Sequence, residues 1–151
     1  MPIWIAVAVA IVIWPVGLGA ALFDRTVPPV SIGSSLIYLA ASRVCHQRPD
    51  RSFHTAGHQW PVCARCAGLY VGGPVGVLLS LRRLRARRAT RNALAVVLGV
   101  AAAPTLLAWA AEAIAGLPVS GVVRALAAAP LGLTVTVVVL SLLRPHRSSI
   151  G

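Results

Sequence analysis

Four long apolar runs constrain this chain more than any other feature of its sequence. They cover residues 3–23, 62–81, 93–115 and 122–143. Each is about 20 residues long, the length at which an α-helix rising about 1.5 Å per residue crosses a hydrocarbon core of about 30 Å. Barrel strands are about ten residues long and alternate in polarity, which these runs do not. The sequence therefore predicts an all-α integral membrane bundle of about four transmembrane helices.

The composition agrees with a chain that is surrounded by lipid. Of its 151 residues, 58% are hydrophobic and 11% charged, so a soluble domain of this size would lack the polar residues to cover its surface. The first run has no basic segment before it and exceeds the usual apolar length of a signal peptide, about 7–15 residues, so we interpret it as an uncleaved helix. Without repeats or long linkers, we expect a single transmembrane domain over residues 1–151.

The basic residues predict how the chain crosses the membrane. All 14 are arginines, against three acids, which gives a formal net charge of +11. Six of them lie within residues 82–91, and the positive-inside rule assigns such a loop to the cytoplasm. Because topology explains this charge, we do not expect nucleic-acid binding. The predicted orientation in the cell membrane puts both termini in the cytoplasm and the loop 24–61 on the external side.

Two local patterns predict how the helices are arranged. In the external loop, a serine cap precedes Ile32, Leu36 and Leu39 at helical spacing, which indicates a short interfacial helix over residues 31–44 that would deliver Cys45 to the other cysteines. In the second apolar run, glycines recur every four residues. They are Gly68, Gly72 and Gly76, and small residues on one face let another helix approach closely in lipid.

The residues that carry chemistry gather in an external Cys/His loop. All three cysteines and three of the four histidines fall between Cys45 and Cys66. Cys63 and Cys66 are three apart at the predicted start of a helix, with Pro61 in its first turn, so their sulfurs should share one face. The helix N-terminus stabilises thiolate, and Arg65 adds positive charge. We expect this pair to serve as metal ligands or as redox thiols.

A metal site is the first interpretation of these thiols. Three thiolates and one imidazole make an ordinary zinc set, and iron can use the same ligands. The expected ligands are Cys45, His46, Cys63 and Cys66. His54 and His58 lie in a polar loop, where solvation or hydrogen bonding is the more common role for a histidine, so they rank as supporting residues.

A membrane thiol oxidoreductase that passes electrons from Cys63 and Cys66 to a quinone is the second interpretation. The external side is expected to be oxidising, and the vitamin K epoxide reductase and bacterial disulfide-oxidase families share the helix count and a CxxC near a span end. The chain lacks a second cysteine pair to relay electrons, which argues against an oxidoreductase. A third interpretation is an accessory subunit that needs a protein partner. There is no phosphate loop or nucleophile elbow, and whether the chain is an enzyme stays open.

Glu112 and Arg124 are ionisable residues near the external ends of the third and fourth runs. They can meet across the loop 116–121. Ionisable side chains at membrane depth are costly and often functional, although both can also snorkel to the interface. We expect an anchoring ion pair or, if it lies beside the cysteines, a group that moves protons or binds a small anion.

The Cys/His loop resembles a known family. The motif CHQxPxRSF beginning at Cys45, followed by VCARCxGxYxG ending at Gly72, is similar to the domain-of-unknown-function 2085 (DUF2085) family of small prokaryotic membrane proteins. The resemblance implies that His46 is the histidine of the signature, with Tyr70 as a supporting residue. It implies a membrane protein with no established activity.

The C-terminal half resembles that family less closely. Ala108 stands where the family pattern has an acid, Gly121 where it has asparagine, and Ala127 and Ala128 where it has Thr-Gly. Keeping the cysteines while losing these polar groups favours a metal-binding or structural role over proton-coupled catalysis.

Overall fold

Four long helices form the body of the protein in a computed structural model that describes residues 2–27, 29–82 and 90–144. They are α1 (Ile3–Arg25), α3 (Ala64–Arg82), α4 (Arg91–Ala113) and α5 (Gly121–Leu143). Each is long and apolar enough to cross a membrane, so the predicted all-α fold with four spans is confirmed. The predicted cytoplasmic loop falls mostly on residues 83–89, and these lie outside the described residues, as do both chain ends.

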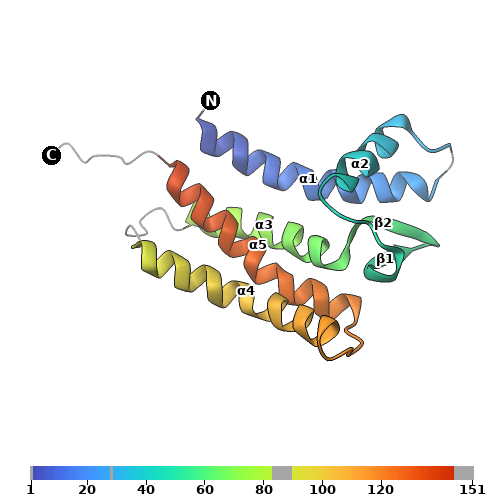
Figure 1. Ribbon diagram of the computed structural model, residues 1–151. Coiled ribbons are helices and arrows are strands. Elements are labelled where there is room, and N and C mark those ends of the chain that lie inside the picture. Colours follow the sequence, from blue (N-terminus) through green and yellow to red (C-terminus); the bar gives the residue numbers. More distant parts are fainter. Residues whose placement is uncertain (1, 28, 83–89, 145–151) are drawn as a thin grey trace.

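The long helices lie side by side in the order α1, α3, α5, α4, as Figure 1 shows. The starts of α1 and α4 and the ends of α3 and α5 lie at one end of the bundle. The shorter elements, including α2 (Ile32–Ser42), gather at the other end, which we call the hairpin end (Figure 1). This alternation is what four successive membrane crossings require.

Glycines bring α3 and α5 into backbone contact. Gly68, Gly72 and Gly76 face α5 so closely that a Cβ on any of them would overlap its backbone carbonyl oxygens. Gly132 on α5 approaches the backbone of Leu69 in the same way. The contact that the glycine spacing predicts is therefore confirmed, and it makes α3 and α5 the most extensive helix pair. Direct packing of this kind holds helices together where lipid removes the hydrophobic drive between them.

The predicted interfacial helix forms as α2, slightly shorter than expected. Ser31 is its N-cap, and its Oγ accepts a hydrogen bond of 3.2 Å from the backbone N–H of Ser34. At the other end, the N–H of Cys45 donates to the carbonyl of Ala41 over 2.9 Å. This bond holds Cys45 against the end of α2, as predicted.

A short β-hairpin, which the sequence analysis did not predict, precedes α3. It pairs β1 (Ser52–Thr55) with β2 (His58–Cys63) in antiparallel fashion and follows a single 3-10 turn, η1 (Pro49–Arg51). Ala56 and Gly57 join the strands with φ of 50° and 78°, the left-handed pair that a two-residue hairpin turn needs.

This hairpin corrects the predicted start of the second span. Pro61 lies in β2 and not in a first helical turn, and α3 begins only at Ala64. The chain stays extended to Cys63 because Ser52 pairs with Cys63 across the hairpin. Cys63 is therefore the last residue of a strand, directly before the helix that carries Cys66.

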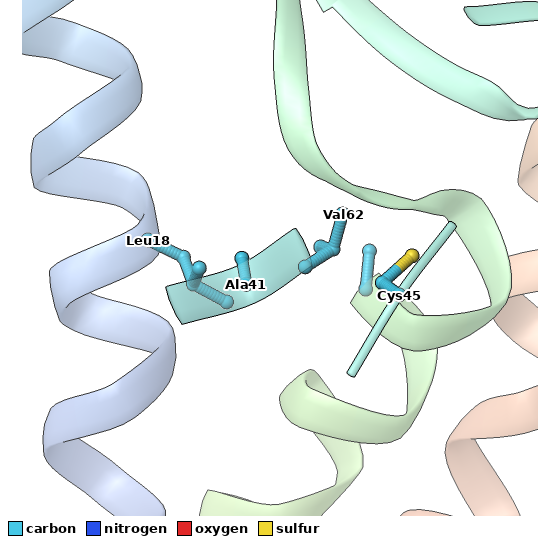
Figure 2. Packing of buried hydrophobic residues seen from close by; sticks show 5 residues of the cluster. Leu18, Ala41, Cys45 and Val62 are labelled. Atoms are coloured by element: carbon cyan, nitrogen blue, oxygen red, sulfur yellow. The ribbon is translucent and has the colours of Figure 1, made fainter. Parts of the chain in front are cut away.

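A buried cluster fastens the hairpin end to the long helices. Figure 2 shows these side chains lying next to one another in a row: Leu18 of α1, Ala41 of α2, Val62 of β2 and Cys45. Val62 is 2% exposed and Ala41 fully buried. The loop that carries Cys45 is thus part of the buried core and does not lie on its surface.

The glycine contact predicts that a methyl group added in α3 lowers the stability of the protein, whereas one added in α4 does not. Gly72→Ala places a Cβ against backbone atoms of Ala129 and Leu133, so we expect a loss of about 1–3 kcal/mol in the free energy of unfolding. Gly99→Ala in α4 is the matched control, because nothing lies within 4 Å of its Cβ and alanine is favoured over glycine inside helices by about 0.5–1 kcal/mol. Thermal unfolding in detergent, followed by circular dichroism, measures both, and equal effects would contradict the contact.

Candidate functional site

The sulfurs of all three cysteines meet at the hairpin end of the bundle. Cys45 follows α2, Cys63 ends β2 and Cys66 lies in the first turn of α3. The three sulfurs lie within 4.8 Å of one another. A tetrahedral zinc ion with Zn–S bonds of about 2.3 Å holds its sulfurs about 3.8 Å apart, so this group is close to the spacing that a metal ion needs. We call it the cysteine cluster.

The cluster is partly shielded from solvent, and its cysteines are free thiols. Cys45 is buried, while Cys63 and Cys66 are half-buried. The backbone N–H of Cys63 donates to Sγ of Cys45 over 3.1 Å, which ties the loop after α2 to the start of α3. The loop after α2 therefore supplies one sulfur, and the junction of β2 with α3 supplies the other two.

Cys63 is the sulfur best prepared to carry negative charge. Its pKa is lowered to about 5, chiefly because the thiol of Cys66 donates a hydrogen bond to it, with backbone N–H groups of Cys66 and Arg65 adding to the effect. Burial acts in the opposite direction and is outweighed. The N–H groups belong to the first turn of α3, where unpaired helix donors stabilise an anion.

The histidines lie away from the three sulfurs. His46 is exposed next to Cys45, and its ring nitrogens are not among the atoms that lie within 4.8 Å of one another. His54 in β1 and His58 in β2 are exposed as well. The structure thus brings together three of the four predicted ligands, and a fourth ligand from His46 stays a prediction.

Gln47 is a structural residue that the sequence analysis missed. Its side-chain Nε2 donates to the backbone carbonyl of Tyr38 over 2.9 Å and to that of Pro61 over 2.8 Å. Its backbone carbonyl accepts a hydrogen bond from Nε2 of Gln59. Its φ of 46° is unusual for a residue other than glycine. Gln47 therefore locks α2 to β2 directly beside Cys45. Its presence in the CHQ motif was the available signal, but an uncharged amide gave no chemical reason to single it out.

Aromatic rings surround the cluster and join it to neighbouring helices. Tyr70, one turn after Cys66, packs edge-on against Trp14 of α1 with ring centroids 6.2 Å apart. Phe53 of β1 packs edge-on against Trp60 at 5.3 Å and also contacts Gly121 at the start of α5. Tyr70 thus serves the cluster by packing, and Phe53 docks the hairpin onto α5.

The predicted ion pair between Glu112 and Arg124 forms, and Arg65 joins it. Arg65 donates through Nη2 to Oε2 of Glu112, and Arg124 donates through Nε to Oε1. The side chains are 20%, 9% and 14% exposed for Arg65, Glu112 and Arg124, so the group is largely buried. We call it the charge triad. Because Arg65 stands between Cys63 and Cys66 in the chain, the triad links the cysteine motif to both α4 and α5.

Comparison with known proteins relates the chain to an uncharacterised group. The family model described as a predicted membrane protein (DUF2085) matches residues 45–138, more than half of the chain and well beyond the motif itself. An uncharacterised protein of Methanocaldococcus jannaschii is 48% identical over 46 residues, 30% of either chain. One of Methanothermobacter thermautotrophicus is 52% identical over 29 residues, 19% of this chain and 26% of its own. The chain covers less than a third of each relative, and no solved structure matches it.

The hydrogen bonds of Gln47 predict that its uncharged amide protects Cys45 from solvent. Gln47→Leu removes the donor that bridges the carbonyls of Tyr38 and Pro61, which should cost about 1–3 kcal/mol and open the loop. We expect faster alkylation of Cys45 in the folded protein, measured by mass spectrometry of the labelled peptide. His54→Ala, an exposed change on the same hairpin, should leave the rate unchanged. A rate unaffected by Gln47→Leu would contradict the lock.

The charge triad predicts that Glu112 is needed to hold two arginines together. Glu112→Gln leaves Arg65 and Arg124 facing each other without a carboxylate, and we expect a loss of about 2–3 kcal/mol, just below the range for fully buried pairs. Asp50→Asn is the control, because Asp50 pairs with Arg48 and Arg51 at the exposed surface, where ion pairs contribute little. Unfolding in detergent compares the two, and equal midpoints would count against a structural triad.

Proposed function

The chain belongs to the DUF2085 family of predicted membrane proteins, and from that premise we propose that Cys45, Cys63 and Cys66 bind one thiophilic metal ion, most simply zinc. The observation that carries this proposal is the convergence of three sulfurs within 4.8 Å from three separate elements. A dithiol needs only two sulfurs at that distance. The third, from Cys45, is what a metal ion uses and a simple disulfide does not.

The chemistry of the donors supports a soft or borderline cation. Thiolates favour zinc, iron and copper(I) over calcium or magnesium. The first turn of α3 and the neighbouring thiol stabilise the Cys63 thiolate, and a thiolate is the form that binds metal. When bound, such an ion would cross-link α2, β2 and α3 and so contribute directly to the stability of the hairpin end.

We propose His46 as the fourth ligand. It adjoins Cys45 and is exposed, so its ring is not held by packing in the core. By the same arginine pattern that predicts the topology, the cluster faces the external side of the cell membrane. A site at this boundary, beside the charge triad, would organise the loop or bind a small ligand.

Metal content tests the proposal directly. We expect about one equivalent of metal per chain in detergent-purified protein, measured by inductively coupled plasma mass spectrometry, and its loss in Cys45→Ser, Cys63→Ser and Cys66→Ser, because three protein thiolates are the core of the site. His46→Ala should lower the affinity, whereas His54→Ala is the matched control and should retain the metal. Loss of metal from only the Cys63 and Cys66 variants would contradict a role for Cys45.

The thiol oxidoreductase is the second candidate, favoured by the lowered pKa of Cys63 beside Cys66. In that reaction the two thiols would form one disulfide and transfer two electrons and two protons to a quinone. Thiol counting in the same preparation separates the candidates. Metal-free protein that releases two thiols on reduction would favour the redox reaction, whereas three free thiols that appear only after chelation would favour the metal site.

A further inference from the structure

A polar cavity of about 190 Å³ lies at the hairpin end, where α1 finishes. Its lining residues are Arg25, Tyr38, Gln47, His58, Gln59 and Trp60. None of the three cysteines lines it, so it is separate from the cysteine cluster. One water molecule occupies about 30 Å³ of liquid, so the cavity has room for a tetrahedral oxyanion.

Arg25 brings a positive charge to this cavity, and no carboxylate of the described residues forms a salt bridge with it, although the charge of Asp24 lies next to it in the chain. Its guanidinium carbon lies 4.0 Å from the centroid of the Tyr38 ring. A cation over an aromatic ring is attracted by the ring but receives no hydrogen bond from it. Within the described part of the chain, Nε of Arg25 is buried without a hydrogen-bond partner. A buried donor of this kind is costly unless an acceptor is supplied.

None of the carboxylate side chains in the described residues serves as that acceptor. The protein's three acidic side chains are all engaged elsewhere. Asp24 accepts from the N–H of Ser31, Asp50 pairs with Arg48 and Arg51, and Glu112 pairs with Arg65 and Arg124. These described carboxylates therefore give Arg25 no direct hydrogen-bonded partner, which a bound anion would supply.

Most other side chains that line the cavity already donate their hydrogen bonds to groups of the protein. The amides of Gln47 and Gln59, the indole of Trp60 and the hydroxyl of Tyr38 all donate within the protein. Among the described residues, the donors left for a ligand are those of Arg25 and the ring of His58. A site that offers a guanidinium and an imidazole, and little else, selects a compact group rich in acceptors.

We propose that this cavity binds a phosphate group, from the headgroup of an anionic phospholipid or from free phosphate. Guanidinium matches phosphate through two parallel, charge-assisted hydrogen bonds. Arg25 is the last residue of α1, a helix long enough to cross the hydrocarbon core, so it lies at the level of the headgroups. Tyr38 and Trp60 are side chains of the kind that favour this level.

Purified protein in maltoside micelles, in phosphate-free buffer, tests the proposal in two arms. Native mass spectrometry after addition of phosphatidylglycerol measures retained lipid, and ³¹P line broadening measures binding of inorganic phosphate. In at least one arm we expect binding that weakens by about tenfold or more in Arg25→Gln, as loss of a charge-assisted pair would cause. Arg43→Gln, an exposed arginine at the end of α2, is the matched control and should bind as the unmodified protein does.

The two arms also identify the source of the phosphate. If lipid is retained and the ³¹P line of inorganic phosphate is not broadened, the ligand is the phospholipid headgroup. If the line is broadened and no lipid is retained, the ligand is free phosphate. Arg25→Lys keeps the charge without the planar fork and should bind between the unmodified protein and Arg25→Gln, which guards against a variant that simply misfolds. Binding in neither arm, or equal losses in Arg25→Gln and Arg43→Gln, would overturn the proposal. Metal content is an independent readout, so the metal proposal stands or fails separately.

Discussion

The backbone contact between α3 and α5 is the constraint on which the rest of the structure depends. In lipid, apolar side chains gain little by leaving their surroundings for one another, so helices associate through close packing and polar contacts. Gly68, Gly72 and Gly76 supply the close packing, and they fix both the rotation and the height of α3 against α5. Because α3 begins with Ala64, Arg65 and Cys66, that contact also fixes where the reactive residues stand. A larger residue in the glycine row would move the whole hairpin end.

The first turn of α3 carries two kinds of chemistry on different sides. Cys66 faces Cys63 and Cys45, whereas Arg65 reaches Glu112 and therefore α4. Successive residues of a helix are rotated by about 100°, so neighbours in the motif necessarily point to different partners. The positions of the sulfurs and of the charge triad are thus coupled through the first turn of α3. Displacing the charge triad would be expected to shift the sulfurs as well, without any direct contact between the two groups.

The sequence predicted those features that depend on local pattern and missed those that depend on tertiary contacts. Apolar length located the four spans, and a serine cap located α2. The hairpin was missed because its turn is Ala56-Gly57, whereas Asn-Gly is the strong signal for such turns. The contact of Arg65 with Glu112 was missed because it depends on how α3 and α4 are both arranged around α5, which is a matter of tertiary packing. The convergence of the three sulfurs could be predicted, since loop closure was the simplest use of three nearby cysteines.

Two arginine–aromatic pairs lie at opposite ends of the bundle. Arg25 stacks on Tyr38 at the hairpin end, and Arg144 stacks on Trp4 at the other, 4.9 Å from the ring centroid. Trp4 and Arg25 lie near opposite ends of α1, separated by about 30 Å at about 1.5 Å per residue, which is the thickness of a hydrocarbon core. Arginine and tryptophan both favour the boundary between lipid and water. The two pairs are therefore separated along the bundle by about the thickness of a hydrocarbon core, and the cysteine cluster lies at the same end as Arg25 and Tyr38.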